Sequence, residues 1–235
     1  MADPFRNLRL YWHRMMKTSL ITMDGVRVHA DADRVPRPVR NGLFKGTYED
    51  AERALMARVL KSGCKVLEIG GGIGLVGLIA ARIAGSGQVT SYEANPLMKP
   101  MIEANYALNS IAPDLRMKAI TVDGKPVSFH QSDNVISSSL YQRAETQTTV
   151  TVESDALADV LVELAPDVVI MDVEGAEIDL LANLSLDGVK ALVVELHPHI
   201  VGQQKIDNLL ASLAERGFET TGNMRNNVLL ERAVS

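Results

Sequence analysis

The sequence predicts an α/β protein built on a doubly wound, mostly parallel sheet. From residue 65 onward, short apolar runs typical of buried strands alternate with helix-like runs, which is the pattern of a parallel sheet with helices on both faces. A glycine-rich turn, residues 70–74, joins the first strand-like run to the helix after it. The last two strand-like runs are separated by only a few residues, and so short a link permits only antiparallel pairing. The sheet is therefore expected to end in an antiparallel C-terminal strand.

The individual elements follow from local patterns. A helix is expected at 47–63, because Thr47 is a suitable N-cap, Asp50 sits at the capping-box spacing and Gly63 follows the last turn. The remaining elements are read from apolar runs and helical periodicity. Strands are expected at 65–70, 88–94, 114–122, 167–175 and 189–198, a closing pair at 218–222 and 226–234, and helices at 75–85, 96–110 and 203–217.

Two segments depart from the alternation. Residues 124–154 hold two short β patterns around a serine-rich loop, which predicts a β-hairpin inserted over one end of the sheet. Residues 34–42 contain two prolines and are expected to form an extended loop. We divide the chain into an N-terminal extension, 1–46, expected to cap the substrate side, and a main domain, 47–235.

Composition narrows the function class. The chain has 235 residues, a net charge of -5 and only 4% aromatic residues, so neither a basic footprint nor a base-stacking surface for nucleic acid is expected. No apolar run is long enough to span a membrane, and the start lacks the core of a signal peptide. The single cysteine, Cys64, permits no internal disulfide. We expect a soluble, cytoplasmic protein with a small-molecule substrate, no nucleic-acid partner and no membrane partner.

The glycine turn raises a choice between two cofactors. "GIGLVG", residues 72–77, matches the G-x-G-x-x-G of NAD-binding proteins, but it begins two residues later than that fingerprint usually does. "E-x-G-G-G-x-G" from Glu68 fits better the turn of enzymes that use S-adenosylmethionine, in which glycines let backbone approach the cofactor. Glu93 ends the second strand about 20 residues after the turn, where a carboxylate can bind the ribose of either cofactor. An NAD-dependent oxidoreductase, and a binding module without catalysis, stay open as alternatives.

A resemblance discriminates between the two cofactors. The segments "VLEIGGGIG", "SYEANP", "VVIMDVEGAEIDLL" and "VVELHP", in this order, resemble the FkbM family of class I S-adenosylmethionine-dependent methyltransferases over about residues 43–200. "GTYED" at 46–50 and "SSSL" at 137–140 are also similar to that family. Its turn commonly reads "D-x-G-A-N-x-G", whereas this chain has "E-I-G-G-G-I-G" and lacks the asparagine.

The resemblance implies a Rossmann-like class I methyltransferase fold and a role for each matching residue. Glu68 would lie near the methionine amino group of the cofactor, Glu93 would bind its ribose, and Asp172 would lie near its reacting end. The remaining cofactor-binding residues would be Gly70, Gly72 and Gly74 in the loop, with Asp123 and Gly124 beside the adenine.

Methyl transfer to a hydroxyl benefits from a base that removes the acceptor's proton. Asp172, Glu174 and His197 are the candidates, because each follows an apolar strand at the edge where parallel α/β sheets bind ligands. No compact metal-ligand spacing is visible, so no metal is expected. The expected reaction is O-methylation of a small-molecule or sugar hydroxyl. Residues 8–17 predict an amphipathic helix that covers the site or contacts a second subunit, so a homodimer is an open alternative.

Overall fold

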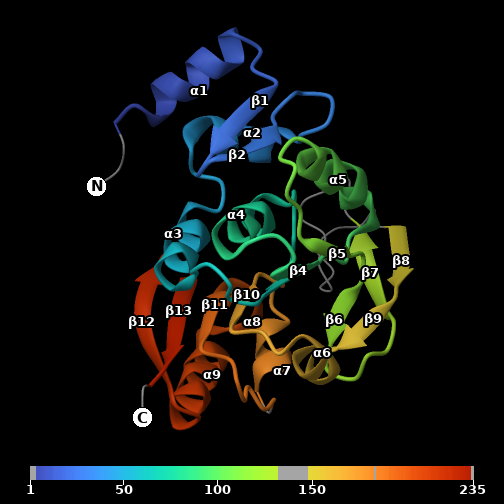
Figure 1. Ribbon diagram of the computed structural model, residues 1–235, viewed down its shortest axis with the longest axis vertical. Coiled ribbons are helices and arrows are strands. Elements are labelled where there is room, and N and C mark those ends of the chain that lie inside the picture. The colour runs from blue at the N-terminus through green and yellow to red at the C-terminus, as the bar shows by residue number, and fades with distance from the viewer. Residues whose placement is uncertain (1–3, 132–147, 183, 234–235) are drawn as a thin grey trace.

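The computed structural model describes residues 4–131, 148–182 and 184–233. Its centre is a seven-stranded sheet in the order β12-β13-β11-β10-β3-β4-β5 (Figure 1). The strands pair in parallel except for β13, which is antiparallel to both of its neighbours. This confirms the predicted parallel sheet with an antiparallel C-terminal strand. The strand bounds are β3 Val66–Ile69, β4 Val89–Tyr92, β5 Asp114–Arg116, β10 Val168–Met171, β11 Ala191–Glu195, β12 Phe218–Met224 and β13 Asn227–Arg232.

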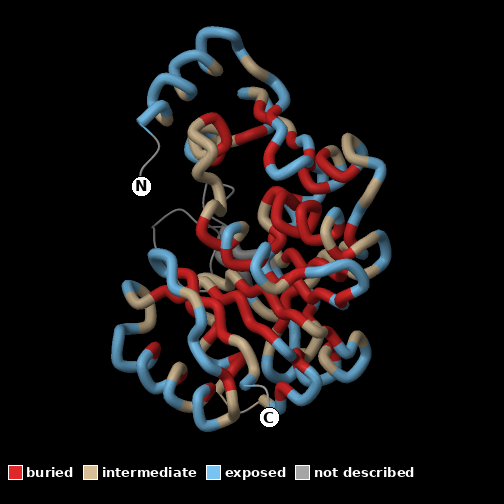
Figure 2. The backbone as a smooth tube through the Cα atoms, turned by 60° about the vertical axis from the view of Figure 1, so that its left-hand side comes forward, coloured by how far each residue is buried: buried red, intermediate tan, exposed pale blue. Residues whose placement is uncertain are grey.

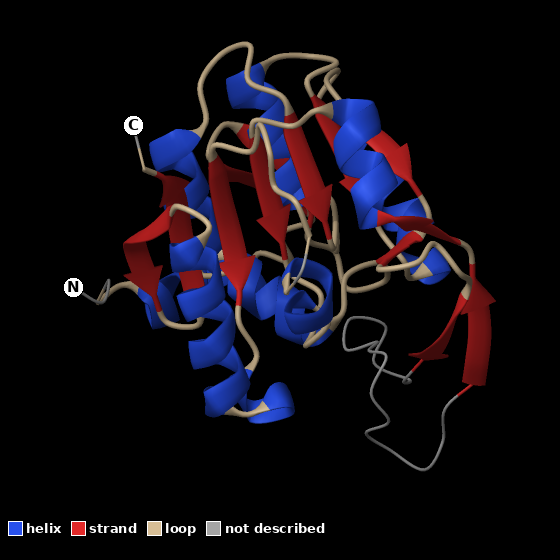
Figure 3. Cartoon of the chain, turned by 90° about the horizontal axis from the view of Figure 1, so that it is seen from below, coloured by secondary structure: helices blue, strands red, loops and turns tan. Residues whose placement is uncertain are grey.

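Helices cover both faces of this sheet, and alternate strand residues pack against opposite layers (Figure 3). Val168 and Ile170 of β10 belong to the core beneath one layer, whereas Val169 and Met171 belong to the core beneath the other. Figure 2 shows that buried backbone gathers at the centre of the main domain, where the strands of the sheet lie. The first layer consists of α3 Asp50–Val59, α4 Leu75–Ala84 and α5 Lys99–Ala107, and the 3-10 turn η1 Pro96–Met98 precedes α5. The second layer contains α6 Leu157–Leu164, α7 Glu177–Leu181 and α9 Gln203–Glu215, and the short helix α8 Pro198–Val201 precedes α9.

The N-terminal segment folds as α1 Arg6–Met15, a β1 Leu20–Met23 and β2 Val26–His29 hairpin, and α2 Arg37–Lys45. The prediction of an extended loop at 34–42 is wrong for most of that segment, because α2 begins at Arg37. Pro38 lies in the first turn of α2, where its missing N–H is not needed by the helix. The hairpin and α2 share one hydrophobic core with α3 and α4. The division at residue 46 stays a prediction.

Two further boundaries differ from the expectation. The first main-domain helix begins at Asp50, with Glu49 rather than Thr47 as its N-cap. The expected third strand splits, because β6 Ala119–Thr121 leaves the main sheet and pairs in parallel with β9 Ser154–Ala156.

The inserted hairpin is confirmed as β7 Val127–Gln131 paired antiparallel with β8 Thr148–Val152. The serine-rich loop with "SSSL" lies outside the described residues. Among the helices that the structure describes, none is long and apolar enough to cross a membrane.

Candidate active site

The glycine turn connects the carboxyl end of β3 to the start of α4, as predicted. Gly70, Gly72 and Gly74 have φ values of 97°, 54° and 79°, a region that residues with a Cβ rarely adopt. A Cβ on Gly70 would lie only 2.0 Å from the backbone oxygen of Asp172. The turn therefore packs directly against the end of β10 and leaves its backbone open to close approach by a ligand.

Glu93 follows β4 and forms a hydrogen bond with the glycine turn. Its two carboxylate oxygens accept hydrogen bonds from the backbone N–H of Gly72, at 2.8 Å, and of Asn95, at 2.6 Å. Burial raises the pKa of Glu93 to about 7, although these backbone N–H groups oppose the rise. Each oxygen has a second lone pair for another donor, such as a ribose hydroxyl. The geometry fits the ribose role, which stays a prediction.

Glu68 lies on β3, beneath α4, and is 1% exposed. Its Oε2 accepts a hydrogen bond from the Ser91 hydroxyl, and a Cβ on Gly77 would lie 2.4 Å from that oxygen. Burial raises the pKa of Glu68 to about 8. Oε1 is buried and has no hydrogen-bond partner among the described residues. Glu68 thus lies in the core between β4 and α4, and its role near the methionine amino group stays a prediction.

Asp123 and Gly124 follow β6 rather than a strand of the main sheet. Asp123 is exposed, and its carboxylate lies 2.6 Å from Lys125 Nζ, an ion pair that lowers the pKa of Asp123. The backbone N–H of Gly124 donates to Thr121 Oγ1 at 2.9 Å. Their placement beside an adenine stays a prediction.

Three carboxylates converge next to the glycine turn from three separate segments. Glu49 is the N-cap of α3, Asp172 follows β10 and Glu195 ends β11. One oxygen from each lies within 4.8 Å of the others, close enough to hold a metal ion. The sequence predicts no metal because these ligands are far apart in the chain, and that expectation is untested.

The carboxylates of this cluster repel one another. Burial raises the pKa of Glu49 to about 7, with a further contribution from the nearby charge of Glu195. Burial, Glu195 and Glu49 also raise the pKa of Asp172 well above its usual value. Asp172 Oδ1 is buried, and no residue that the structure describes forms a hydrogen bond with it. Glu49 has a left-handed φ of 48°, which is unfavourable for a residue with a Cβ.

His197 lies beside this cluster, as predicted. Its Nε2 is 3.6 Å from Asp172 Oδ1 and 3.9 Å from Glu174 Oε2, and its Nδ1 is 3.4 Å from Glu177 Oε1. Burial alone would lower the pKa of His197, but Glu177 and Asp172 outweigh burial and raise it. A raised pKa favours the protonated ring. The environment therefore suits His197 better as a counter-cation for Asp172 than as a base, and its catalytic role stays a prediction.

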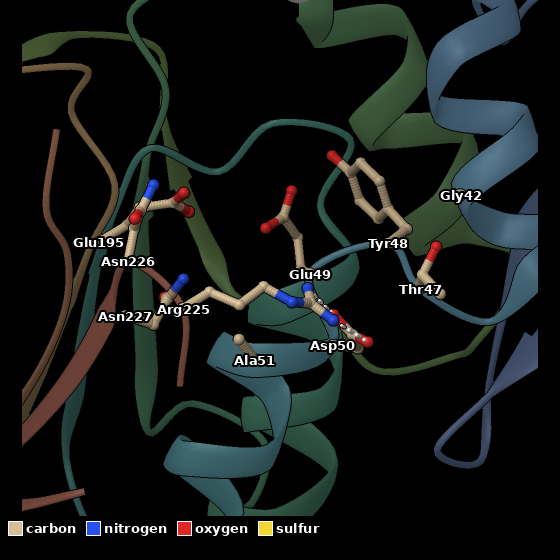
Figure 4. Close-up of a pocket in the computed structure, with 10 residues that line it drawn as sticks. All are labelled: Gly42, Thr47, Tyr48, Glu49, Asp50, Ala51, Glu195, Arg225, Asn226 and Asn227. Carbon is tan, nitrogen blue, oxygen red and sulfur yellow. Dashed lines mark hydrogen bonds and ion pairs between the residues drawn. The ribbon is translucent and has the colours of Figure 1, made fainter. Parts of the chain in front are cut away.

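A cavity of about 260 Å³ opens beside the three carboxylates. Glu49 and Glu195 point toward one another across it, and Arg225 runs along one side to Asp50 (Figure 4), with Arg225 Nη2 donating to Asp50 Oδ2 at 2.8 Å. Asn227 is 5% exposed, and its Oδ1 has no hydrogen-bond partner. The cavity is lined by Gly42, Thr47, Tyr48, Glu49, Asp50, Ala51, Glu195, Arg225, Asn226 and Asn227.

Sequence reasoning missed most of this lining. Tyr48 and Glu49 lie within "GTYED", which the resemblance includes without giving either residue a role. Tyr48 places its hydroxyl 3.2 Å from the position of a Cβ on Gly72, so it lies beside the turn. Burial raises the pKa of the Tyr48 hydroxyl well above its usual value, which keeps it a neutral donor. Arg225 lies in the turn between β12 and β13 and Asn227 is the first residue of β13, and the sequence offers no local signal for either.

Comparison with known proteins gives a family match. The model of the methyltransferase FkbM domain matches residues 68–220. An arginine N(omega)-methyltransferase of Streptomyces achromogenes subsp. streptozoticus is 36% identical over 117 residues, which are 46% of this chain and 31% of that relative. The matched part is thus about a third of the relative's length.

One solved structure supports the fold, and a second shows only a similarity. TYW2 of P. horikoshii, in complex with MeSAdo, aligns with a TM-score of 0.50 at 12% identity, over 97% of this chain and 82% of that chain. A ribosomal protein L11 methylase from Lactobacillus delbrueckii subsp. bulgaricus aligns with a TM-score of 0.45 at 17% identity, over 78% of each chain.

The family match covers the glycine turn, Glu93, the end of β10 and the end of β11 in one continuous span. It decides the choice between cofactors in favour of S-adenosylmethionine and against NAD. The chain belongs to the FkbM family of S-adenosylmethionine-dependent methyltransferases.

Proposed function

We propose that this protein methylates a nitrogen of a small cationic acceptor, with a guanidinium as the preferred group, in the acidic cavity. The observation that carries the proposal is the convergence of Glu49, Asp172 and Glu195, with one oxygen from each inside 4.8 Å, directly beside the glycine turn. At about 260 Å³ the cavity is at or below the small end of ligand pockets, which favours a small molecule or one side chain.

Electrostatics favours a cation over a neutral hydroxyl. Carboxylates that repel one another in a partly buried site are stabilised when a positive group binds between them. A guanidinium is planar and presents several N–H donors, which matches two carboxylates at once. Glu49 and Glu195, which face each other across the cavity, would orient it, and the unpartnered Asn227 Oδ1 offers one more acceptor.

S-adenosylmethionine supplies a methyl group that its sulfonium already activates, so the chain's residues provide alignment and proton removal. The backbone of Gly70–Gly74 and the carboxylate of Glu93 would hold the cofactor. As the acceptor nitrogen gains the methyl group it releases one proton. Asp172 would receive it, because the bound cation and protonated His197 favour its ionised form and its Oδ1 has no hydrogen-bond partner among the described residues. Protonated His197, 3.6 Å away, would stabilise Asp172 while it is charged.

The arginine N(omega)-methyltransferase supports this acceptor class, since the name given to that relative specifies a guanidinium nitrogen. The support is limited to the 46% of this chain that it matches.

O-methylation of a small-molecule or sugar hydroxyl, which the sequence predicts, is the second candidate. One observation favours it: His197 lies within 3.9 Å of both Asp172 and Glu174, so a hydroxyl bound there would meet several proton acceptors. The cluster of negative charge makes it the weaker candidate, because a neutral hydroxyl would leave that charge uncompensated.

The deciding experiment is a methyl-transfer assay with matched acceptors. Arginine and agmatine carry a guanidinium, whereas citrulline carries a neutral group of nearly the same shape. We expect transfer to arginine or agmatine, and at least about 100-fold less to citrulline, since a buried carboxylate facing a neutral group loses a charged hydrogen bond. Transfer to sugars but to neither guanidinium compound would overturn the proposal in favour of the hydroxyl.

A variant pair separates acceptor binding from cofactor binding. Glu195→Gln should raise KM for the guanidinium acceptor by about 10- to 100-fold, the scale of one charged hydrogen bond. Affinity for S-adenosylhomocysteine, measured by calorimetry, should change by less than about threefold. Glu215→Gln, on the exposed side of α9, is the control and should change neither.

A further inference from the structure

Helix α1 presents its apolar side to solvent. Leu8 is 63% exposed, Tyr11 68%, Trp12 50% and Met15 60%, and Met16, just after the helix, is 57% exposed. Positions 8, 12 and 15 recur at helical spacing, so these side chains form one stripe along α1. The helix lies at one end of the molecule, beyond the β1–β2 hairpin (Figure 1).

The side of α1 that faces the protein makes both apolar and polar contacts, since Leu10 packs against the core and the His13 ring stacks on Phe44. Arg9 Nη2 donates to the backbone oxygen of Lys45 at 2.8 Å, and Arg14 Nη2 donates to Asn41 Oδ1 at 2.8 Å. Arg6 Nη2 lies 3.7 Å from Asp50 Oδ2. A surface helix normally turns its apolar stripe inward and its charges outward. Here Leu10 turns inward, but the larger apolar stripe turns outward and is not covered by the residues that the structure describes.

We propose that the outward stripe of α1, Leu8, Tyr11, Trp12, Met15 and Met16, pairs with the same stripe of a second copy of this chain. One patch is sufficient for such a dimer, because a two-fold axis brings identical surfaces together. With typical areas of large apolar side chains, the exposed parts amount to roughly 600 Å² per copy, close to the roughly 800 Å² of a standard interface. Tryptophan, tyrosine and methionine are also residues enriched in interfaces.

The contacts of the arginines in α1 favour a second copy of the chain over a lipid surface as the partner of the stripe. A helix that lies on a membrane directs Lys and Arg toward anionic head groups while its apolar side inserts. In α1, Arg9 and Arg14 flank the stripe and instead donate hydrogen bonds to Lys45 and Asn41 of α2. The contacts therefore favour an apolar protein surface over a membrane, and vesicle binding becomes an outcome of the test.

Trp12 makes the association directly measurable, because it is the only tryptophan in the chain. Sedimentation of the full chain from about 1 to 200 µM should show the mass doubling. Over the same concentration range, the tryptophan emission should shift to shorter wavelength as Trp12 becomes covered. Both transitions should have the same midpoint.

The variant that tests the surface is Leu8→Glu with Met15→Glu, which keeps Trp12 as the reporter. We expect it to weaken dimerisation at least about 10-fold, because two buried charges replace apolar contacts. The matched control is Val162→Glu on α6, an apolar residue 84% exposed elsewhere, which should leave the dimer unchanged. Circular dichroism should show both variants folded, since all three side chains are exposed.

Three results would overturn the proposal. The chain could stay monomeric at about 200 µM, well above typical affinities of specific dimers. It could dimerise with no response to the α1 variant. It could bind vesicles of phosphatidylserine and phosphatidylcholine through the stripe, with binding lost in the α1 variant, which would assign the stripe to a membrane.

Discussion

The carboxylates at the two halves of the active site differ in what they contact. Around the glycine turn, Glu93 accepts backbone hydrogen bonds from Gly72 and Asn95, and Glu68 is bonded to Ser91. In the acidic cluster, one carboxylate oxygen each of Glu49, Asp172 and Glu195 lies within 4.8 Å of the others, and burial together with these charges raises the pKa of Glu49 and of Asp172. The carboxylates beside the turn thus accept hydrogen bonds from the chain's own donors, whereas those in the acidic cluster repel one another, and we propose that a cation binds between them.

The two halves also differ in how they are assembled. The turn, Glu68 and Glu93 come from β3, β4 and the residues directly after them. The cavity combines the start of α3, the end of β11 and the turn between β12 and β13, and Asp172, after β10, lies beside Glu49 and Glu195. Substitutions in the turn should therefore affect fold and cofactor, whereas substitutions in the cavity should affect the acceptor.

The largest effect is expected at Gly70. Gly70→Ala would place a Cβ 2.0 Å from the Asp172 backbone oxygen, at a φ of 97°. We expect a loss of more than about 3 kcal/mol in the free energy of unfolding, from collision plus backbone strain. Gly63→Ala is the control, because φ is 84° there but nothing lies within 4 Å. It should cost only about 1 to 2 kcal/mol. Urea unfolding of both variants checks this, and equal losses would show that the contact with Asp172 is unimportant.

The next largest effect is expected at Asp172, where the two halves meet. Asp172→Asn keeps the backbone oxygen against Gly70 but removes the proton acceptor. Turnover should fall by about 10²- to 10⁴-fold, the usual range for loss of a general base. His197→Gln should cost less, since His197 would act through the charge of Asp172. Single-turnover rates of both variants, with S-adenosylhomocysteine affinity measured in parallel, check the ranking. A larger loss in His197→Gln would return the base role to the histidine.

The strands, the helices and the residues at the strand ends could be predicted from local sequence patterns. Apolar strands alternating with helices predicted the sheet, and the short final link predicted that β13 is antiparallel. The ends of β10 and β11 predicted that Asp172, Glu174 and His197 converge, because parallel strands present their carboxyl ends together. The segment 34–42 was misread because two prolines suggest a loop, although proline is well tolerated in a first helical turn such as that of α2.

The cavity could not be predicted from the sequence, because the residues that line it are distant from one another in the chain. Glu49 and Glu195 are separated by nearly the whole domain, and Arg225 reaches Asp50 from the last hairpin. A carboxylate at the start of a helix is ordinary, so nothing local marks Glu49 as part of a site. Its left-handed φ of 48° is visible only in the structure.

A smaller effect is expected at Glu93. Glu93→Ala should weaken binding of S-adenosylhomocysteine by about 1.5 to 3 kcal/mol, roughly 10- to 150-fold, if its free lone pairs bind the ribose. Exposed Glu103, on α5, is the control position for the same substitution. Calorimetry on the two folded variants measures the difference. Unchanged affinity in Glu93→Ala would place the ribose elsewhere.

The smallest effect concerns pH and Glu68, on the side of the site that the chain itself satisfies. Burial raises the pKa of Glu68 to about 8 in the folded protein, whereas an unfolded glutamate titrates near 4.5. Between these values the folded state holds a proton that the unfolded state has lost, so this group makes stability fall as pH rises from about 4.5 to 8. Glu68→Gln keeps the shape and cannot ionise, so it should remove that part of the decline. Relaxation around the buried group reduces the effect, and we expect the variant to gain about 1 to 2 kcal/mol on the wild type between pH 5 and pH 8. Urea unfolding at both pH values, with Glu103→Gln as the exposed control, measures it. A constant difference between variant and wild type at the two pH values would mean that Glu68 is already ionised in the folded protein, and the core between β4 and α4 would then contain a buried charge.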